Sequence, residues 1–187
     1  MKKDSLDLLN ARDIRQLLIG YQSRQEKIPQ QIVNLLESLA DVSDEVRNIN
    51  QLHHSLQTAT MAEAAGASEE IILCALVHDM GKSLSQANHA NIAAEIVKPY
   101  VSENAYWLIK THDEFQAYYF NHFFGKDPEI RQKYKGQSWY DLAIQFSQEW
   151  DSKAFDQNYK VKPISYFQPL IYQFFSKCPY DNVKLAK

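Results

Sequence analysis

Apolar side chains recur three and four positions apart along most of this chain, and strict alternation of apolar and polar residues is scarce. That period places the apolar side chains on one face of a helix and therefore predicts a helical protein. Proline suits the first turn of a helix and glycine suits its end, so both kinds of boundary residue agree with this interpretation. The first two stripes are Ile32, Leu35, Leu36 and Leu39 after Pro29, and Ile49, Leu52, Leu56 and Ala59 before Gly66.

Further helices follow from the same spacing and from residues that cap helices. Ser68 suits the N-cap of a fully apolar helix that ends near His78, and Gly81 is expected to stop that helix. Ser102 suits the N-cap of a helix that runs through His112 toward Phe120. Three more helices are predicted over residues 88–98, 139–150 and 164–175, with loops or short helices over 125–136 and 156–163.

The composition agrees with one all-α domain. The chain has 187 residues, enough for a single domain to bury about two-thirds of its unfolded surface. Only five glycines and six prolines are present, and alternating β-branched runs are few. We expect residues 46–176 to form a helical bundle, residues 1–45 to add covering helices to the same domain as a hairpin, and residues 177–187 to form a C-terminal tail.

The net charge and the cysteines indicate which partners and which cellular compartment to expect. The net charge of −3 provides no basic field, so a nucleic acid is not expected as a partner. There is no apolar run of about 18 residues and no apolar N-terminal stretch typical of a secretory signal. The two cysteines, Cys74 and Cys178, are typical of reduced thiols, and Cys74 is expected to be a core residue. These features favour a cytoplasmic protein without a membrane partner.

The most informative chemistry is the pair His78–Asp79, which ends the apolar run that begins at Ile71. A buried carboxylate is costly unless a cation or hydrogen bonds compensate it. Imidazole and carboxylate are both ligands for divalent metals, so the pair predicts a buried metal site. Further residues of ligand type recur at broadly even intervals along the chain: His54, His89, His112 and Asp151.

The order His … His-Asp … His … His … Asp resembles that of the HD-domain superfamily of metal-dependent hydrolases and oxygenases. The flanking residues are most similar to those of the mixed-valent diiron HD oxygenases, which are the phosphonate-cleaving oxygenases and myo-inositol oxygenase. The resemblance covers residues 48–175 and implies an all-α HD-domain bundle with a buried dinuclear metal site. The segments that carry it are Gln51 to Ala59, Asn88 to Ala94, Lys98 to Val101, Glu149 to Asp151 and Tyr166 to Ile171.

The resemblance also implies a role for each ligand. The Asp79 carboxylate would bridge two ions, of which one is completed by His54, His78 and Asp151, and the other by His89 and His112. The resemblance favours two iron ions as a mixed-valent Fe²⁺/Fe³⁺ pair, with Mn²⁺ or another divalent metal as the alternative. His53 competes with His54 for the first position, and the match of the Leu-Gln-Thr-Ala segment favours His54.

Lys82 and Gln116 are candidates for contact with substrate. Lys82 matches a lysine that myo-inositol oxygenase directs at its substrate, and it joins Asp79 as a candidate catalytic residue. Gln116 stands where the similar phosphonate oxygenases carry a lysine that grips the phosphonate. A neutral amide loses a charge-assisted contact worth roughly 1.5–3 kcal/mol. The segment 41–50 also lacks the tyrosine with which some of those enzymes cap an iron, so a phosphonate substrate is disfavoured.

An aromatic cluster follows Gln116 and is expected to be mostly core. Tyr118, or its neighbour Tyr119, is the member expected to face the substrate pocket. His122 falls in the same cluster, outside the ligand pattern, and is expected to be structural.

Three functions remain open at this point. The resemblance favours an O₂-dependent diiron oxygenase that cleaves a C–C or C–P bond of a small hydroxylated substrate, with that substrate and O₂ as its partners. The main alternative is an HD-type phosphohydrolase that acts on a nucleotide or phosphate ester, and the third is a degenerate HD binding module. The complete ligand set speaks against the third.

Overall fold

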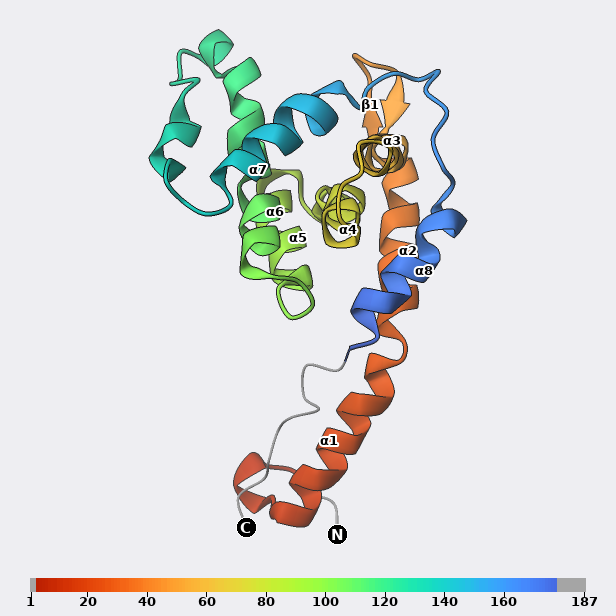
Figure 1. The fold of residues 1–187 in the computed structure, drawn as a ribbon. Helices are drawn as coiled ribbons and strands as arrows, with labels where there is room; N and C mark the ends of the chain where they lie inside the picture. Colours follow the sequence, from red (N-terminus) through yellow and green to blue (C-terminus); the bar gives the residue numbers. More distant parts are fainter. Residues whose placement is uncertain (1–2, 178–187) are drawn as a thin grey trace.

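The computed structural model describes residues 3–177, and Cys178 with the remainder of the expected tail lies outside the described residues. Helices make up nearly all of the regular structure, as predicted (Figure 1). Within the described range, every helix is too short or too polar to cross a membrane. The α-helices are α1 (Ala11–Gln25), α2 (Ile28–Glu37), α3 (Gln51–Ala64), α4 (Glu69–Val77), α5 (His89–Val97), α6 (Glu103–Gln116), α7 (Tyr140–Gln145) and α8 (Ile164–Phe175).

Short elements join these helices. The strands β1 (Ser43–Asp44) and β2 (Ile49–Asn50) pair as an antiparallel ladder, and a π-helical segment, η8 (Phe146–Trp150), follows α7. The 3-10 segments are η1 (Leu6–Leu8), η2 (Ser38–Asp41), η3 (Met80–Ser83), η4 (Gln86–Asn88), η5 (Ala117–Tyr119), η6 (Asn121–Phe124), η7 (Ile130–Tyr134) and η9 (Asp151–Lys153).

Helix α4 is the central helix of the bundle (Figure 1). Every side chain from Ile71 to Val77 is buried, and α3, α6 and α8 pack around it. The Ser68 hydroxyl oxygen accepts from the Ile71 amide at 3.4 Å, so the predicted N-cap is confirmed. A helix that is apolar on all faces belongs in the interior, and it therefore carries His78 and Asp79 into the protein.

Helix α3 begins two residues later than the apolar stripe predicted. Ile49 belongs to β2, and the Asn50 side chain caps the helix by accepting from the His53 amide at 2.8 Å. Gly66 ends the helix as predicted, because it adopts a φ of 77° that favours glycine. The structure thus corrects the first position of the stripe and keeps the others.

The N-terminal helices do not form the expected hairpin. Helix α2 buries apolar side chains such as Ile32 and Leu36 and packs beside α8. Helix α1 precedes α2 in the chain, and Figure 1 shows that it projects away from the bundle. Within α1, all of which is described, only Gln25 is buried, and its Nε2 donates to the Phe175 carbonyl oxygen at 2.8 Å. Helix α1 is therefore attached through its last turn and covers little else.

Gly81 does not stop α4, which ends before it at Val77. Gly81 lies in η3, where the chain passes against the start of α5. A Cβ at this position would stand 2.2 Å from the carbonyl oxygen of His89. Only glycine permits that approach, which places the first residue of α5 next to the end of α4.

The helix predicted over residues 139–150 is divided in two. Helix α7 changes into the π-helical segment η8, and Asp151 follows directly. A π-helical turn adds a residue to the turn and is frequent at functional sites. Here it lets the buried side chains of Phe146 and Trp150 pack in the core while Asp151 faces the interior.

Gly81→Ala should lower the free energy of unfolding by about 1–3 kcal/mol, because the His89 backbone has to move away from the new Cβ. Gly20→Ala is the matched control, since its Cβ would meet only the Arg24 side chain at 3.7 Å. Alanine there should stabilise α1 by about 0.5–1 kcal/mol. Urea denaturation followed by circular dichroism measures both changes, and a Gly81→Ala protein as stable as the wild type would contradict the close approach.

Candidate metal centre

The six residues that the sequence predicted as metal ligands lie together at the centre of the bundle. Five of them are at most 2% exposed, and His89 is 9% exposed. They come from five parts of the chain: His54 from α3, His78 and Asp79 from just after α4, His89 from the start of α5, His112 from α6, and Asp151 from the start of η9.

The Asp79 carboxylate lies between two pairs of imidazoles. Its Oδ2 is 3.4 Å from Nε2 of both His54 and His78. Its Oδ1 is 3.3 Å from Nε2 of His89 and 3.2 Å from Nε2 of His112. Each carboxylate oxygen faces its own pair of nitrogens, which is the arrangement expected of a carboxylate that bridges two cations.

Backbone carbonyls set the tautomer of all four imidazoles. Nδ1 of His54 donates to the Ala154 carbonyl oxygen at 3.0 Å. Nδ1 of His78, His89 and His112 donates to the carbonyl three residues earlier, at 2.9, 3.0 and 2.7 Å. A carbonyl oxygen can only accept, so the proton of each neutral ring is on Nδ1 and Nε2 presents a lone pair to the centre.

The centre therefore gathers acceptors that face one another. Nε2 of His54 is 3.2 Å from Nε2 of His78, and the Nε2 atoms of His89 and His112 are also 3.2 Å apart. Asp151 Oδ1 lies 3.1 Å from Nε2 of His54, yet neither buried oxygen of Asp151 accepts a hydrogen bond. Such a set is stable only around cations. Four imidazole nitrogens with two carboxylates fit borderline divalent metals such as iron and manganese.

The pKa values of the clustered side chains also indicate that the two carboxylates are ionised and require compensating cations. Burial would raise the pKa of Asp79, but the charges of His78 and the Lys82 ammonium hold that pKa well below its usual value. The pKa of Asp151 is likewise lowered, against its burial, by His78 and His54. Burial opposes the charge of His78, but the two carboxylates outweigh it and raise its pKa to about 10. In the metal-free protein His78 thus holds a proton that a metal has to displace.

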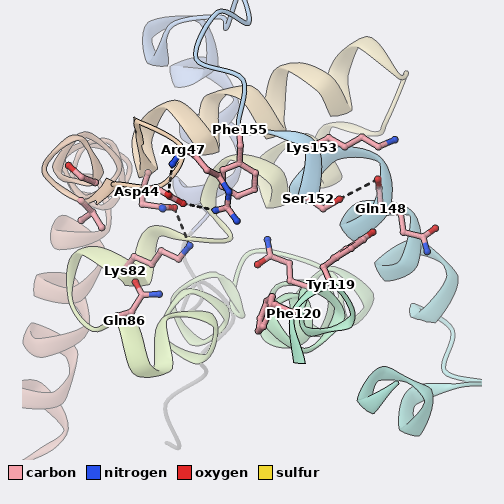
Figure 2. Close-up of a pocket in the computed structure, with 14 residues that line it drawn as sticks. Asp44, Arg47, Lys82, Gln86, Tyr119, Phe120, Gln148, Ser152, Lys153 and Phe155 are labelled. Atoms are coloured by element: carbon pink, nitrogen blue, oxygen red, sulfur yellow. Dashed lines mark hydrogen bonds and ion pairs between the residues drawn. The ribbon is translucent and has the colours of Figure 1, made fainter. Parts of the chain in front are cut away.

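A cavity of about 680 Å³ opens beside the cluster (Figure 2). Lys82 connects the two, because its Nζ lines the cavity and donates to Asp79 Oδ2 at 2.6 Å and to Gln51 Oε1 at 3.1 Å. Gln116 also lines the cavity. Pockets of about 300–1,000 Å³ hold small molecules, so the dimensions suit a small polar substrate next to the candidate metals.

The expectation that the aromatic cluster is mostly core is wrong, because its members after Gln116 are exposed: Tyr118, Tyr119, Phe120, Phe123 and Phe124. Tyr119 lines the cavity, whereas Tyr118 does not and instead stacks under Arg131, whose guanidinium carbon is 3.7 Å from the ring centroid. His53 points away from the cluster toward the Asp156 carbonyl oxygen, 3.2 Å from its Nε2. His122 is exposed and packs against the Phe123 ring.

Three residues that contribute to the site were missed by the sequence analysis. Phe155 stacks on the His54 ring with centroids 4.4 Å apart and an interplanar angle of 16°, and Ala154 supplies the carbonyl that orients the same ring. Arg47, in the segment examined only for a missing tyrosine, reaches the cavity from the β1–β2 turn. Ala154 and Phe155 follow Asp151 closely in the sequence, and that proximity could have identified them as neighbours of the cluster. No local pattern identifies Arg47.

The comparisons with known proteins agree with this geometry. The family model of the HD domain matches residues 52–154, a range that contains all six residues of the cluster. No curated protein matches the chain.

We expect two metal ions per chain at saturation, and His89→Ala should lower the content toward one, because only His112 and Asp79 Oδ1 then remain for the second ion. His53→Ala is the matched control: it removes a neighbouring imidazole that faces away and should keep two ions. Elemental analysis with protein quantification measures the ratio. A wild type that takes up a single ion at saturating metal would show that the assignment of His89 and His112 is wrong.

Asp79→Asn should weaken the binding of both ions by more than about 100-fold, since the loss of an outer hydrogen-bond partner alone costs about 10–100-fold. The amide keeps the shape of the carboxylate but removes the charge shared by the two imidazole pairs. Competition with a chelator measures the affinities. Retention of both ions with wild-type affinity would exclude a bridging role.

Proposed function

The chain belongs to the HD-domain family, and from that premise we propose that it is an O₂-dependent diiron oxygenase that cleaves a C–C or C–P bond of a small hydroxylated substrate. Membership of the family implies a divalent-metal-dependent enzyme or a related binding module. The finer assignment to an oxygenase with two irons rests on the arrangement of the cluster and on the lining of the cavity.

The observation that carries the proposal is the pair of donor sets that share Asp79. His54 and His78 face one oxygen of Asp79, with Asp151 Oδ1 next to both of these imidazoles, and His89 and His112 face the other oxygen. HD enzymes with a single metal typically lack the two middle histidines, so their presence favours a dinuclear centre. A module that only binds a partner has no need for six buried groups with so costly an arrangement.

Some residues of the site would hold the metals, and others would contact the substrate. A bound iron pair would supply the redox chemistry through which O₂ oxidises the carbon that carries a hydroxyl group. His54, His78, His89 and His112 are held by their backbone hydrogen bonds in the orientation that metal binding needs. Lys82 presents an ammonium group at the boundary between Asp79 and the cavity, where it can orient a substrate oxygen.

The cavity lining favours hydroxyl groups over a dianion. Gln51, Gln86, Gln116 and Gln148 provide amides that both donate and accept hydrogen bonds. Gln116 in place of a lysine leaves no additional charge for a phosphonate. A polar substrate with several hydroxyl groups and little negative charge fits this lining.

The phosphohydrolase alternative has one observation in its favour. Arg47, Lys82 and Lys153 all line the cavity, so it gathers more cationic groups than the sequence motif indicated. Two of the three are already paired within the chain, however, Lys82 with Asp79 and Arg47 with Asp44. Fewer charges are therefore left for a polyphosphate than the lining implies.

Iron-loaded protein should consume O₂ with a hydroxylated substrate and cease turnover under strict anaerobiosis, because the proposed reaction uses O₂ as the oxidant. An oxygen electrode and mass spectrometry of products, applied to a panel of polyols, hydroxycarboxylates, hydroxyphosphonates and nucleotides, measure this. His53→Ala is the control that leaves the cluster complete. Anaerobic release of phosphate from nucleotides by the Mn²⁺-loaded protein would instead establish the hydrolase.

A further inference from the structure

Three planar groups from distant parts of the chain form one column between the metal cluster and the cavity. The imidazole of His54 stacks on the ring of Phe155 at 4.4 Å. On that ring lies the guanidinium of Arg47, with its central carbon 3.8 Å from the centroid. Both Arg47 and Phe155 line the cavity (Figure 2), and the Arg47 side chain is 49% exposed. The column therefore presents a cation to the cavity at a fixed place relative to His54.

Asp44 holds this guanidinium by one side only. Its Oδ2 accepts from Arg47 Nη1 at 2.5 Å, and its Oδ1 accepts from the Arg47 backbone amide at 3.0 Å. Within the described residues, Nε and Nη2 of Arg47 have no hydrogen-bond partner. These two nitrogens form one edge of the guanidinium, and their parallel N–H groups match the two oxygens of a carboxylate.

We propose that Arg47 is a specificity-determining residue that binds a carboxylate group of the substrate through its Nε and Nη2 edge, so that the substrate is a small hydroxycarboxylate. This inference rests on the proposed function, because it assumes that the hydroxyl end of the substrate lies toward Lys82 and the metals. Lys82 and Arg47 then take the two ends of one molecule, with the cavity amides between them.

The charge around Arg47 favours a carboxylate over a phosphonate or phosphate. Asp44 already offsets one positive charge at this end of the cavity, so the pair has no net charge. A monoanion gains the two parallel hydrogen bonds with little repulsion from Asp44, whereas a dianion meets more of it. The planar fork also matches a planar carboxylate in shape.

Binding of matched probes to the Zn²⁺-loaded protein tests the inference without O₂ or turnover. Glycerate carries hydroxyls and a carboxylate, glycerol carries hydroxyls only, and 2-hydroxyethylphosphonate replaces the carboxylate. Ligand-observed NMR titration gives the dissociation constants. The variants are Arg47→Met, Arg47→Lys, which keeps the charge but loses the fork, and Lys135→Met, which removes an exposed charge that does not line the cavity.

The wild type should bind glycerate at least about tenfold more tightly than glycerol, the effect of one charge-assisted pair. Arg47→Met should abolish this preference, Arg47→Lys should retain part of it, and Lys135→Met should leave it within about twofold. Metal content and circular dichroism establish that each variant is folded and loaded.

Equal binding of glycerate and glycerol by the wild type, no binding of glycerate, or an undiminished preference in Arg47→Met would overturn the role of Arg47. Tighter binding of the phosphonate than of glycerate would overturn the choice of a carboxylate. None of these results bears on whether O₂ is consumed, so the oxygenase proposal stands or fails separately.

Discussion

The burial of the Asp79 carboxylate among imidazole nitrogens is the constraint on which the rest of the structure depends. A carboxylate at this depth costs several kcal/mol unless cations compensate it, and in the metal-free protein the only cations next to it within the described residues are the Lys82 ammonium and a protonated His78. Helices α3, α4, α5 and α6 all deliver a ligand to the same point, so a metal bound there stabilises the packing of four helices at once. Metal binding and folding are therefore linked in this chain: tighter metal binding raises the free energy of unfolding.

The four imidazole rings of the cluster are oriented in two different ways. His78, His89 and His112 are oriented by the carbonyl three residues earlier, a contact that needs only the local helical or 3-10 geometry. His54 depends instead on Ala154, one hundred positions away, and on the ring of Phe155. The segment that supplies Asp151 as a candidate ligand thus also orients His54, so the tertiary contact that completes the cluster is made by η9 and the two residues that follow it.

The helices and the buried His78–Asp79 pair could be predicted from the sequence for local physical reasons, whereas the full set of six clustered residues came from the resemblance to the HD superfamily. Helical period, N-caps such as Ser68 and Ser102, and the expense of burying His78–Asp79 all lie in short stretches of chain. What escaped prediction depends on contacts between distant residues. Gly81 was interpreted as a helix end, yet its role is the approach to His89. The position of Arg47 over Phe155 requires the β1–β2 turn to contact the segment just after η9, and no periodicity in the sequence predicts that contact.

The division between ligands and cavity explains why the metal site alone does not determine the reaction. The imidazoles and carboxylates face inward and fit any borderline divalent metal, so they serve oxidation and hydrolysis equally well. Discrimination has to come from the groups that face the substrate. In this cavity those groups include amides, aromatic rings and cations, of which Lys82 is paired with Asp79 and Arg47 with Asp44. Under the proposed function, a substrate would gain little there by carrying several negative charges and more by offering hydroxyl groups and one planar anion, a chemistry that differs from that of a site built for polyphosphates.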